Sequence, residues 1–174
     1  MKYIMKSGAL YKDAAVVAHL GGTFSEPEKC IFRTDGNVAF RTDIQERNTA
    51  KEEAGDVRRK KYVILDCNGR ECGEADPEYA AGSDPDVNGW PVCRMPRVDH
   101  ARLVYNGHAY TLKMPSDRKY VLTDRSGAAA VRIVHRGVCG GWDIEASEKF
   151  SPELLCVIFI LCRYLEQENE FVVL

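Results

Sequence analysis

Apolar and polar side chains alternate along most of this chain. Leu112 and Met114 fall on one side of a stretch whose other side carries Thr111 and Lys113, and residues 131–136 alternate in the same way. A two-residue period is typical of antiparallel strands that have one face in a core and the other in water. Counting such stretches predicts about ten to twelve strands.

Short turn signals separate these stretches. Each signal is an Asp or Asn with a Gly one to three residues later, between two apolar runs. Glycine supplies the positive φ that tight hairpin turns need, so these units predict a meander of hairpins. The units are centred on Asp35, Asp66, Asn106 and Asp124.

Two stretches interrupt this pattern. Residues 45–61 are almost all polar, so we expect an excursion between strands, with a helical turn within 49–53. Residues 74–91 contain three prolines, two glycines and five acidic residues without a Lys or Arg. That composition predicts a loop.

One segment has the signals of a helix rather than a strand. Ser151 is a favoured N-cap, Pro152 suits the first helical position, and Glu153 complements the positive end of the helix dipole. These signals predict a helix over 151–166. Its residues 154–162 include no polar side chain, so no face of the helix is suited to water.

An all-apolar helix in a strand-rich chain has to be enclosed by protein or by lipid. A membrane span needs about 20 apolar residues, and this run ends at Arg163, so we expect no transmembrane segment. We therefore predict a mainly β fold, a single closed antiparallel β-barrel of about 10–12 strands over residues 1–174 that encloses the helix at about 151–166. Residues 170–174, which are Glu170 followed by four apolar residues, are expected to dock on this barrel or at the helix exit.

Composition and charge narrow the class further. With 174 residues, of which 45% are hydrophobic and 29% charged, the chain is neither disordered, collagen-like nor a coiled-coil rod. The net charge of −2 does not predict specific nucleic-acid binding. The N-terminal residues lack the apolar run of a signal peptide and the seven cysteines are odd in number, so we expect reduced thiols and a cytoplasmic location.

The arrangement of these units resembles the tubby C-terminal-like superfamily, which includes LURP-one-related proteins and phospholipid scramblases. The resemblance lies in the repeated strand–Asp/Asn–Gly–strand units and in Trp142-Asp143-Ile144 before the C-terminal helix. It covers most of the chain, and the small size is similar to that of bacterial members. The resemblance implies a barrel around a central hydrophobic helix. It also implies recognition of phosphoinositide headgroups, which several tubby-like domains bind on a basic outer surface.

Positive charge is concentrated in the second half of the chain. From Arg94 to Arg136 there are nine Lys and Arg residues against three Asp residues, a local charge of +6, so the remainder carries −8. Such a span is compatible with an anionic ligand such as a lipid headgroup, although charge on strands is more commonly a set of solvated strand faces. The candidate ligand-binding residues are Arg102, Lys113, Arg118, Lys119, Arg132 and Arg136.

A partial calcium-loop motif is the candidate metal site. Asp84, Asp86, Asn88 and Gly89 match the first, third, fifth and sixth positions of such a loop, but Met95 stands where the bidentate Glu should be. An Asx-rich turn explains these residues as well. We therefore expect no cofactor, with calcium as the alternative.

Two cysteine motifs have ordinary structural explanations. Cys67 and Cys72 have a spacing compatible with zinc but lack a second close pair of ligands, so a hairpin turn explains them better. Cys139, followed by two glycines and Trp142, resembles a papain-type nucleophile, yet all four histidines precede it. A glycine bend between strands is the preferred interpretation.

These observations favour a non-enzymatic cytoplasmic binding module for an anionic ligand. No phosphate loop, nucleophile elbow, HExxH motif or dinucleotide fingerprint occurs in the sequence. One alternative is a metal-assisted hydrolase that uses the Asp84–Asn88 residues. The other is an interaction or scaffold barrel that binds a protein partner.

Overall fold

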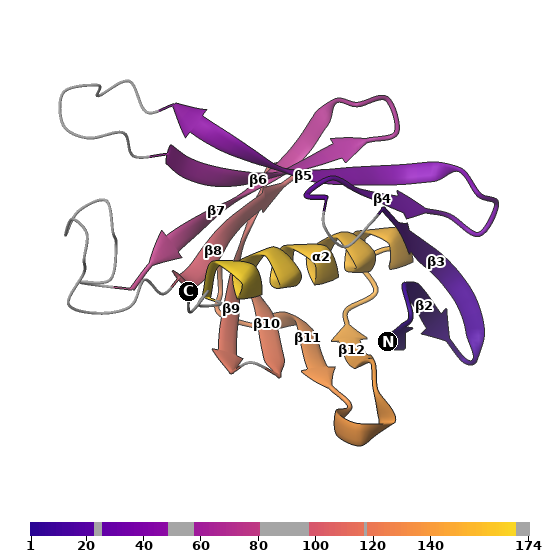
Figure 1. The fold of residues 1–174 in the computed structure, drawn as a ribbon. Coiled ribbons are helices and arrows are strands. Elements are labelled where there is room, and N and C mark those ends of the chain that lie inside the picture. Colours follow the sequence, from indigo (N-terminus) through magenta and orange to yellow (C-terminus); the bar gives the residue numbers. More distant parts are fainter. Residues whose placement is uncertain (23–25, 49–57, 81–97, 117, 170–174) are drawn as a thin grey trace, which may run out of the picture.

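Twelve strands and a C-terminal helix form the structure, a computed structural model that describes residues 1–22, 26–48, 58–80, 98–116 and 118–169 (Figure 1). The strands form one closed barrel in which every neighbouring pair is antiparallel. Their bounds are β1 Lys2–Lys6, β2 Ala9–Lys12, β3 Ala15–Gly21, β4 Lys29–Phe32, β5 Val38–Asn48, β6 Arg58–Asp66, β7 Glu71–Tyr79, β8 Val98–Tyr105, β9 His108–Ser116, β10 Lys119–Asp124, β11 Ala129–His135 and β12 Trp142–Ala146, followed by helix α2 Pro152–Asn169.

The barrel closes because the first strand pairs with the last. Each strand pairs with its neighbours in the sequence, and β1 also pairs with β12 from Lys2↔Glu145 to Met5↔Trp142. The N-terminal amino group adds a hydrogen bond of 2.6 Å to the carbonyl oxygen of Ala146. The predicted closed antiparallel barrel is confirmed.

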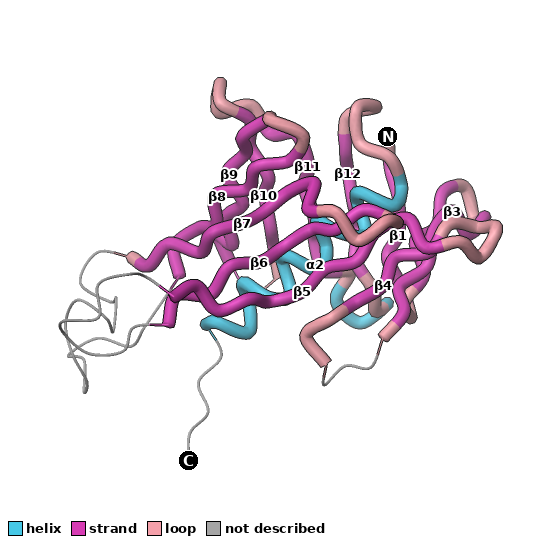
Figure 2. The backbone as a smooth tube through the Cα atoms, turned by 90° about the horizontal axis from the view of Figure 1, so that it is seen from above, coloured by secondary structure: helices cyan, strands magenta, loops and turns pink. Residues whose placement is uncertain are grey.

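Helix α2 crosses the interior of this barrel. In Figure 1 β5 and β6 lie on one side of it and β10 to β12 on the other, and in Figure 2 β5 and β6 pass over it. Every residue from Leu154 to Cys162 is at most 9% exposed, as the uniform apolarity of this segment predicts. The helix begins where expected, since the Ser151 hydroxyl accepts a hydrogen bond of 3.2 Å from the Leu154 amide. It continues to Asn169, three residues beyond the predicted end.

The tight turns between strands repeat one geometry. Gly69 and Gly127 adopt positive φ, and each donates its amide to the carbonyl oxygen of an Asp three residues earlier, Asp66 or Asp124, at 3.0 Å. The carboxylates of these aspartates accept further backbone hydrogen bonds, from Arg70 in the first turn and from Ser126 and Ala128 in the second. The pKa of both carboxyl groups is lowered from its ordinary value of 3.8, mainly by the Arg70 amide at Asp66 and by the Ser126 hydroxyl, which also donates to the carboxylate, at Asp124. The turn signals in the sequence are thus confirmed as hairpin turns.

The predicted excursion at 45–61 is wrong in its two outer parts. Residues 45–48 and 58–61 continue β5 and β6, and they pair in register from Gln45↔Lys61 to Asn48↔Arg58. Backbone pairing persists here although the apolar alternation has stopped. Opposite charges support it, since Glu46 faces Lys60 across the pair. The predicted helical turn at 49–53 lies outside the described residues.

The predicted loop at 74–91 is also wrong in its first part, because β7 continues to Tyr79. Pro77 lies in this strand opposite Ala101 of β8. The Asn106 amide donates a hydrogen bond of 3.1 Å to the Cys72 carbonyl oxygen, so Cys72 is a hydrogen-bonded position of the β7–β8 pair. Hydrogen-bonded and non-hydrogen-bonded positions alternate along an antiparallel pair, so Pro77, five residues later, is a non-hydrogen-bonded position toward β8. Pairing with β6 extends from Leu65↔Glu71 to Tyr62↔Ala75, so Pro77 lies beyond it. A proline is tolerated at this position because a backbone amide there would have no hydrogen-bond partner in the sheet.

Three further expectations lie outside the described residues. They are the rest of the predicted loop at 81–91, its calcium-like residues Asp84, Asp86 and Asn88, and the docking of residues 170–174.

We expect Ile158→Asp to abolish cooperative folding. Ile158 is 1% exposed at the middle of α2, and an unpaired buried charge costs several kcal/mol against a total stability of about 5–15 kcal/mol. Thermal unfolding followed by circular dichroism checks this. The control is Gln167→Asp, at an exposed position of the same helix, which should unfold close to the wild-type temperature. A folded Ile158→Asp variant with unchanged Tm would contradict the enclosure of the helix.

We expect the double variant Asp66→Ala, Asp124→Ala to have a lower Tm than the wild type at neutral pH, and this difference to shrink in acid. Both carboxyl groups have a lowered pKa in the folded state, so their ionised forms stabilise the fold above pH 3.8, and this contribution is lost as the pH falls through the lowered pKa. Tm measured from neutral pH down to about pH 2.5 tests the sign. The control is Asn106→Ala, a turn variant at a residue that does not titrate. It should lower Tm by the same amount at every pH.

Candidate functional site

The six predicted basic residues lie on the outer wall of one half of the barrel. Arg102, Lys113 and Lys119 are exposed on β8, β9 and β10, and Arg132 is exposed on β11. Arg118 is exposed just before β10, and the half-buried Arg136 follows β11. The strand alternation that predicted an outward orientation is therefore confirmed for these side chains.

The sheet register brings three of these cations together. Lys113, Val121 and Arg132 are direct cross-strand partners on β9, β10 and β11, which places the Lys113 and Arg132 backbones about 10 Å apart. Lys119 pairs with Val134, so it is a diagonal neighbour of Arg132 on the same outer face at roughly 7–8 Å. We call Lys113, Lys119 and Arg132 the basic face.

Acidic residues limit the basic face on both sides. On β12, Glu145 forms an ion pair of 3.2 Å with Lys2, and Asp143 forms one of 3.3 Å with Arg136. At the other margin Asp76 of β7 is the direct cross-strand partner of Arg102. Within the described part of the chain, the three side chains of the basic face form no ion pair.

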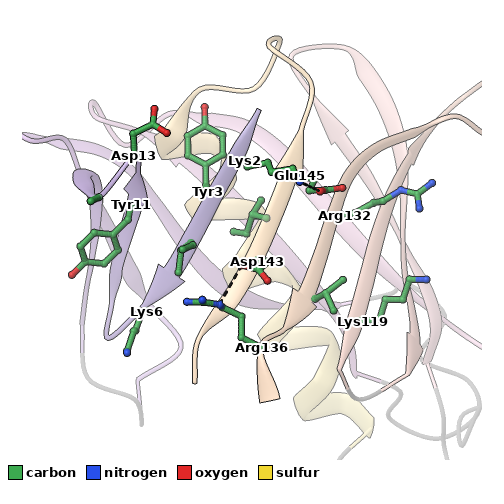
Figure 3. Close-up of a pocket in the computed structure, with 14 residues that line it drawn as sticks. Lys2, Tyr3, Lys6, Tyr11, Asp13, Lys119, Arg132, Arg136, Asp143 and Glu145 are labelled. Atoms are coloured by element: carbon green, nitrogen blue, oxygen red, sulfur yellow. Dashed lines mark ion pairs between the residues drawn. The ribbon is translucent and has the colours of Figure 1, made fainter. Parts of the chain in front are cut away.

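A groove with a volume of about 920 Å³ adjoins the basic face, over β1, β2 and β10 to β12 (Figure 3). In Figure 3 Arg132 and Lys119 extend toward the same side, away from β1. The two ion pairs join Lys2 and Arg136 to the β12 carboxylates Glu145 and Asp143. Its lining includes five cations and three carboxylates, a net charge of +2. The cations are Lys2, Lys6, Lys119, Arg132 and Arg136, and the carboxylates are Asp13, Asp143 and Glu145.

The sequence pattern missed part of this groove. Lys2 and Lys6 are far from the basic span in the sequence, and they reach it because β1 pairs with β12. A signal for them was present in the alternation of β1, where Lys2, Ile4 and Lys6 fall on one side. Using that signal required knowing which strands meet when the barrel closes.

The cations of the groove and of the basic face can attract an anion. Exposed lysine and arginine side chains attract phosphate or carboxylate groups, and this electrostatic attraction weakens as ionic strength rises. Val134, which is 41% exposed, lies between the charged rows and provides an apolar contact. Among the described residues no group of three or more His, Cys, Asp or Glu side chains is placed to hold a metal ion.

The two cysteine motifs lie at turns, with Cys72 in the first residues of β7. Cys67 is exposed in the β6–β7 turn, and the half-buried Cys72 places its thiol 3.5 Å from the Ile64 carbonyl oxygen. Cys139 ends a short 3-10 helix, and the two glycines after it adopt positive φ, which is the predicted glycine bend. The six cysteines of the described residues are free thiols.

Helix α2 is too short in its apolar stretch to cross a membrane, and the same holds for any helix in the described ranges.

Comparison with known proteins gives little further information. No protein-family model matches the chain, and no curated protein matches it. Among solved structures, an X-ray structure of a protein from Arabidopsis thaliana is similar, with 13% sequence identity and a TM-score of 0.37. The match covers 97% of this chain and 91% of the Arabidopsis chain.

We expect the double variant Asp143→Asn, Glu145→Gln to elute from a phosphocellulose column at higher salt than the wild type. The substitutions remove the carboxylates that pair with Arg136 and Lys2, so both cations become available to phosphate groups. The matched control is Glu28→Gln, Glu148→Gln, which makes the same change in net charge at exposed positions outside the groove. Equal elution of the two variants would mean that total charge, and not this groove, governs retention.

Proposed function

We propose that this protein is a non-enzymatic cytoplasmic module that binds an anionic ligand, such as a lipid headgroup, through the basic face. The observation that carries the proposal is the cluster of Lys113, Lys119 and Arg132, three exposed cations on adjoining strands without an ion pair among the described residues. Lys113 and Lys119 keep their full attraction for a ligand, and Glu145, the direct cross-strand partner of Arg132, offsets part of the charge there. Arg136 and Lys2 have carboxylate partners in ion pairs.

The neighbouring apolar positions support a membrane lipid as the source of the anion. Val121 lies between Lys113 and Arg132, and Val134 lies between Lys119 and Asp143. Val134 is exposed and Val121 is half-buried. Cations interleaved with such apolar side chains complement a headgroup region, where phosphate groups and hydrocarbon lie close together. A sheet that presents both to one plane would contact several headgroups at once.

A distant relationship with the tubby-like superfamily is part of the same proposal. A closed twelve-stranded barrel around a C-terminal hydrophobic helix supports it. The headgroup-binding residues of that superfamily have no matching motif in this sequence, so the basic face is inferred from this chain alone.

The test is flotation of the full chain with vesicles at low ionic strength, where the Debye length is about 30 Å at 0.01 M salt. The vesicles contain phosphatidylcholine alone, with phosphatidylserine, or with phosphatidylinositol bisphosphate. We expect binding to both anionic compositions, decreasing as salt rises. A cation near an anionic surface contributes about 1 kcal/mol, so Lys113→Gln, Lys119→Gln, Arg132→Gln should weaken binding by about a hundredfold.

The matched control removes three exposed cations elsewhere, as Arg33→Gln, Arg125→Gln, Lys149→Gln. It makes the same change in net charge as the basic-face variant. Because the three residues lie outside the basic face, it should retain most of the binding. Failure of the wild type to float with either anionic composition at low salt would overturn the proposal. Equal losses in the two triple variants would overturn the role of the basic face.

A further inference from the structure

A second cavity, of about 770 Å³, lies at the barrel end where α2 terminates. Connections on this end join β1 to β2, β3 to β4 and β11 to β12, and all three contribute to its walls. A volume of this size is in the range of about 300–1,000 Å³ found for small-molecule sites. We call it the end pocket.

One face of the helix forms the floor of the end pocket. Phe159, Ile160, Arg163, Tyr164 and Gln167 line it, and their spacing places them on one side of α2. The helix packs mainly against β3 to β6, β8 and β9, so it lies off the barrel axis. The space on the side of β1 and β12 is therefore left partly open.

An aromatic cluster forms the wall opposite β3. The Trp142 ring lies 5.8 Å from the Phe159 ring and 4.8 Å from the His135 ring, measured between centroids. Its other neighbour is Tyr120, at 5.3 Å. Trp142 is half-buried, and its ring lines the pocket together with Met5, Leu20 and Ile44.

Polar contacts from Tyr164 and from Glu166 join α2 to the barrel beside the pocket. The Tyr164 hydroxyl donates to the Pro27 carbonyl oxygen, and the Thr42 hydroxyl, 3.0 Å away, is then the donor toward Tyr164. Burial raises the pKa of Tyr164 to about 12, so this hydroxyl remains a donor at neutral pH. On the other side the Tyr120 hydroxyl donates to the Glu166 carboxylate at 2.6 Å, and Arg163 pairs with the same carboxylate.

The charged side chains of the lining are mostly cationic. Lys6, Lys29 and Arg163 contribute positive charge, and Glu26 is the acidic member of the described lining. Glu166 offsets the charge of Arg163, with which it forms an ion pair, so three cations stand against two carboxylates. Apolar and aromatic walls beneath a rim with more cations than carboxylates complement a ligand with an apolar body and a negative end.

We infer that the end pocket binds an amphipathic anion, a small molecule with a hydrocarbon body and one anionic headgroup. The body lies against Trp142, Phe159 and Leu20, and the headgroup lies at the rim near Lys29 and Arg163. This site is separate from the basic face, since none of Lys113, Lys119 and Arg132 lines it. The inference does not depend on the proposed function.

The experiment uses the full chain with Trp90→Phe, which leaves Trp142 as its sole tryptophan. Decanoate is titrated below its micelle concentration, and binding is followed by Trp142 fluorescence and by calorimetry. Decanol and decyltrimethylammonium, with the same chain and no charge or a positive charge, are the comparison ligands. We expect saturable binding of decanoate with a Kd at least tenfold lower than that of either comparison ligand.

Two variants locate the site. Leu20→Tyr fills the pocket and should weaken decanoate binding at least tenfold, and Lys29→Gln should weaken decanoate but not decanol. Val134→Tyr, a similar substitution on the outer face, and Lys149→Gln, an equal charge change elsewhere, are the controls and should bind normally. Wild-type Tm in each variant excludes loss of the fold as the cause.

Several results would overturn the inference. They are the absence of saturable binding, equal affinity for the three ligands, or unchanged decanoate binding in Leu20→Tyr. Decanoate binding that appears after deletion of residues 170–174, and not before, would also overturn it, because the chain itself would then be the occupant. Flotation with anionic vesicles should be unaffected by Leu20→Tyr, and decanoate binding should be unaffected by the basic-face triple variant, so the two proposals fail independently.

Discussion

Burial of the apolar segment of α2 is the constraint on which the rest of the structure depends. Nine consecutive residues with no polar side chain require a wall on every side, and an open sheet would leave one side of the helix in water. A closed barrel supplies that wall, and it closes through β1 and β12. The inner surface is therefore occupied by packing, which leaves the outer wall and the barrel end where the helix terminates as the surfaces open to a ligand.

Closure of the barrel also determines the composition of the outer groove. It places Lys2 and Lys6 of β1 next to Asp143 and Glu145 of β12, residues that are distant in the sequence. The sequence predicted the cations from Arg102 to Arg136 because they share a short span. It did not predict that β12 would neutralise one margin of that span, since the ion pairs depend on the register between strands. The basic face is consequently narrower than the charge count indicates.

The limits of prediction follow from what a hydrophobic pattern measures. Alternation identified the barrel strands and uniform apolarity identified the enclosed helix, because both patterns report which side chains are buried. The pattern failed at Gln45–Asn48 and Arg58–Lys61, where strand pairing continues with polar side chains. It failed again at Pro77, since a proline signal does not tell whether the missing amide would have had a partner. Pairing is a property of the backbone, and a polar sequence does not exclude it.

The outer groove and the end pocket lie on opposite sides of one wall. Along β1, β12 and β11, the residues Met5, Trp142 and His135 are paired and line the end pocket. Their neighbours Ile4, Asp143 and Val134 are also paired, and they line the groove. Because successive side chains of a strand point to opposite faces, adjacent residues serve different surfaces. The same two-residue period that buries the helix thus gives this wall two differently lined surfaces, the outer groove and the end pocket, and Lys6 lines both.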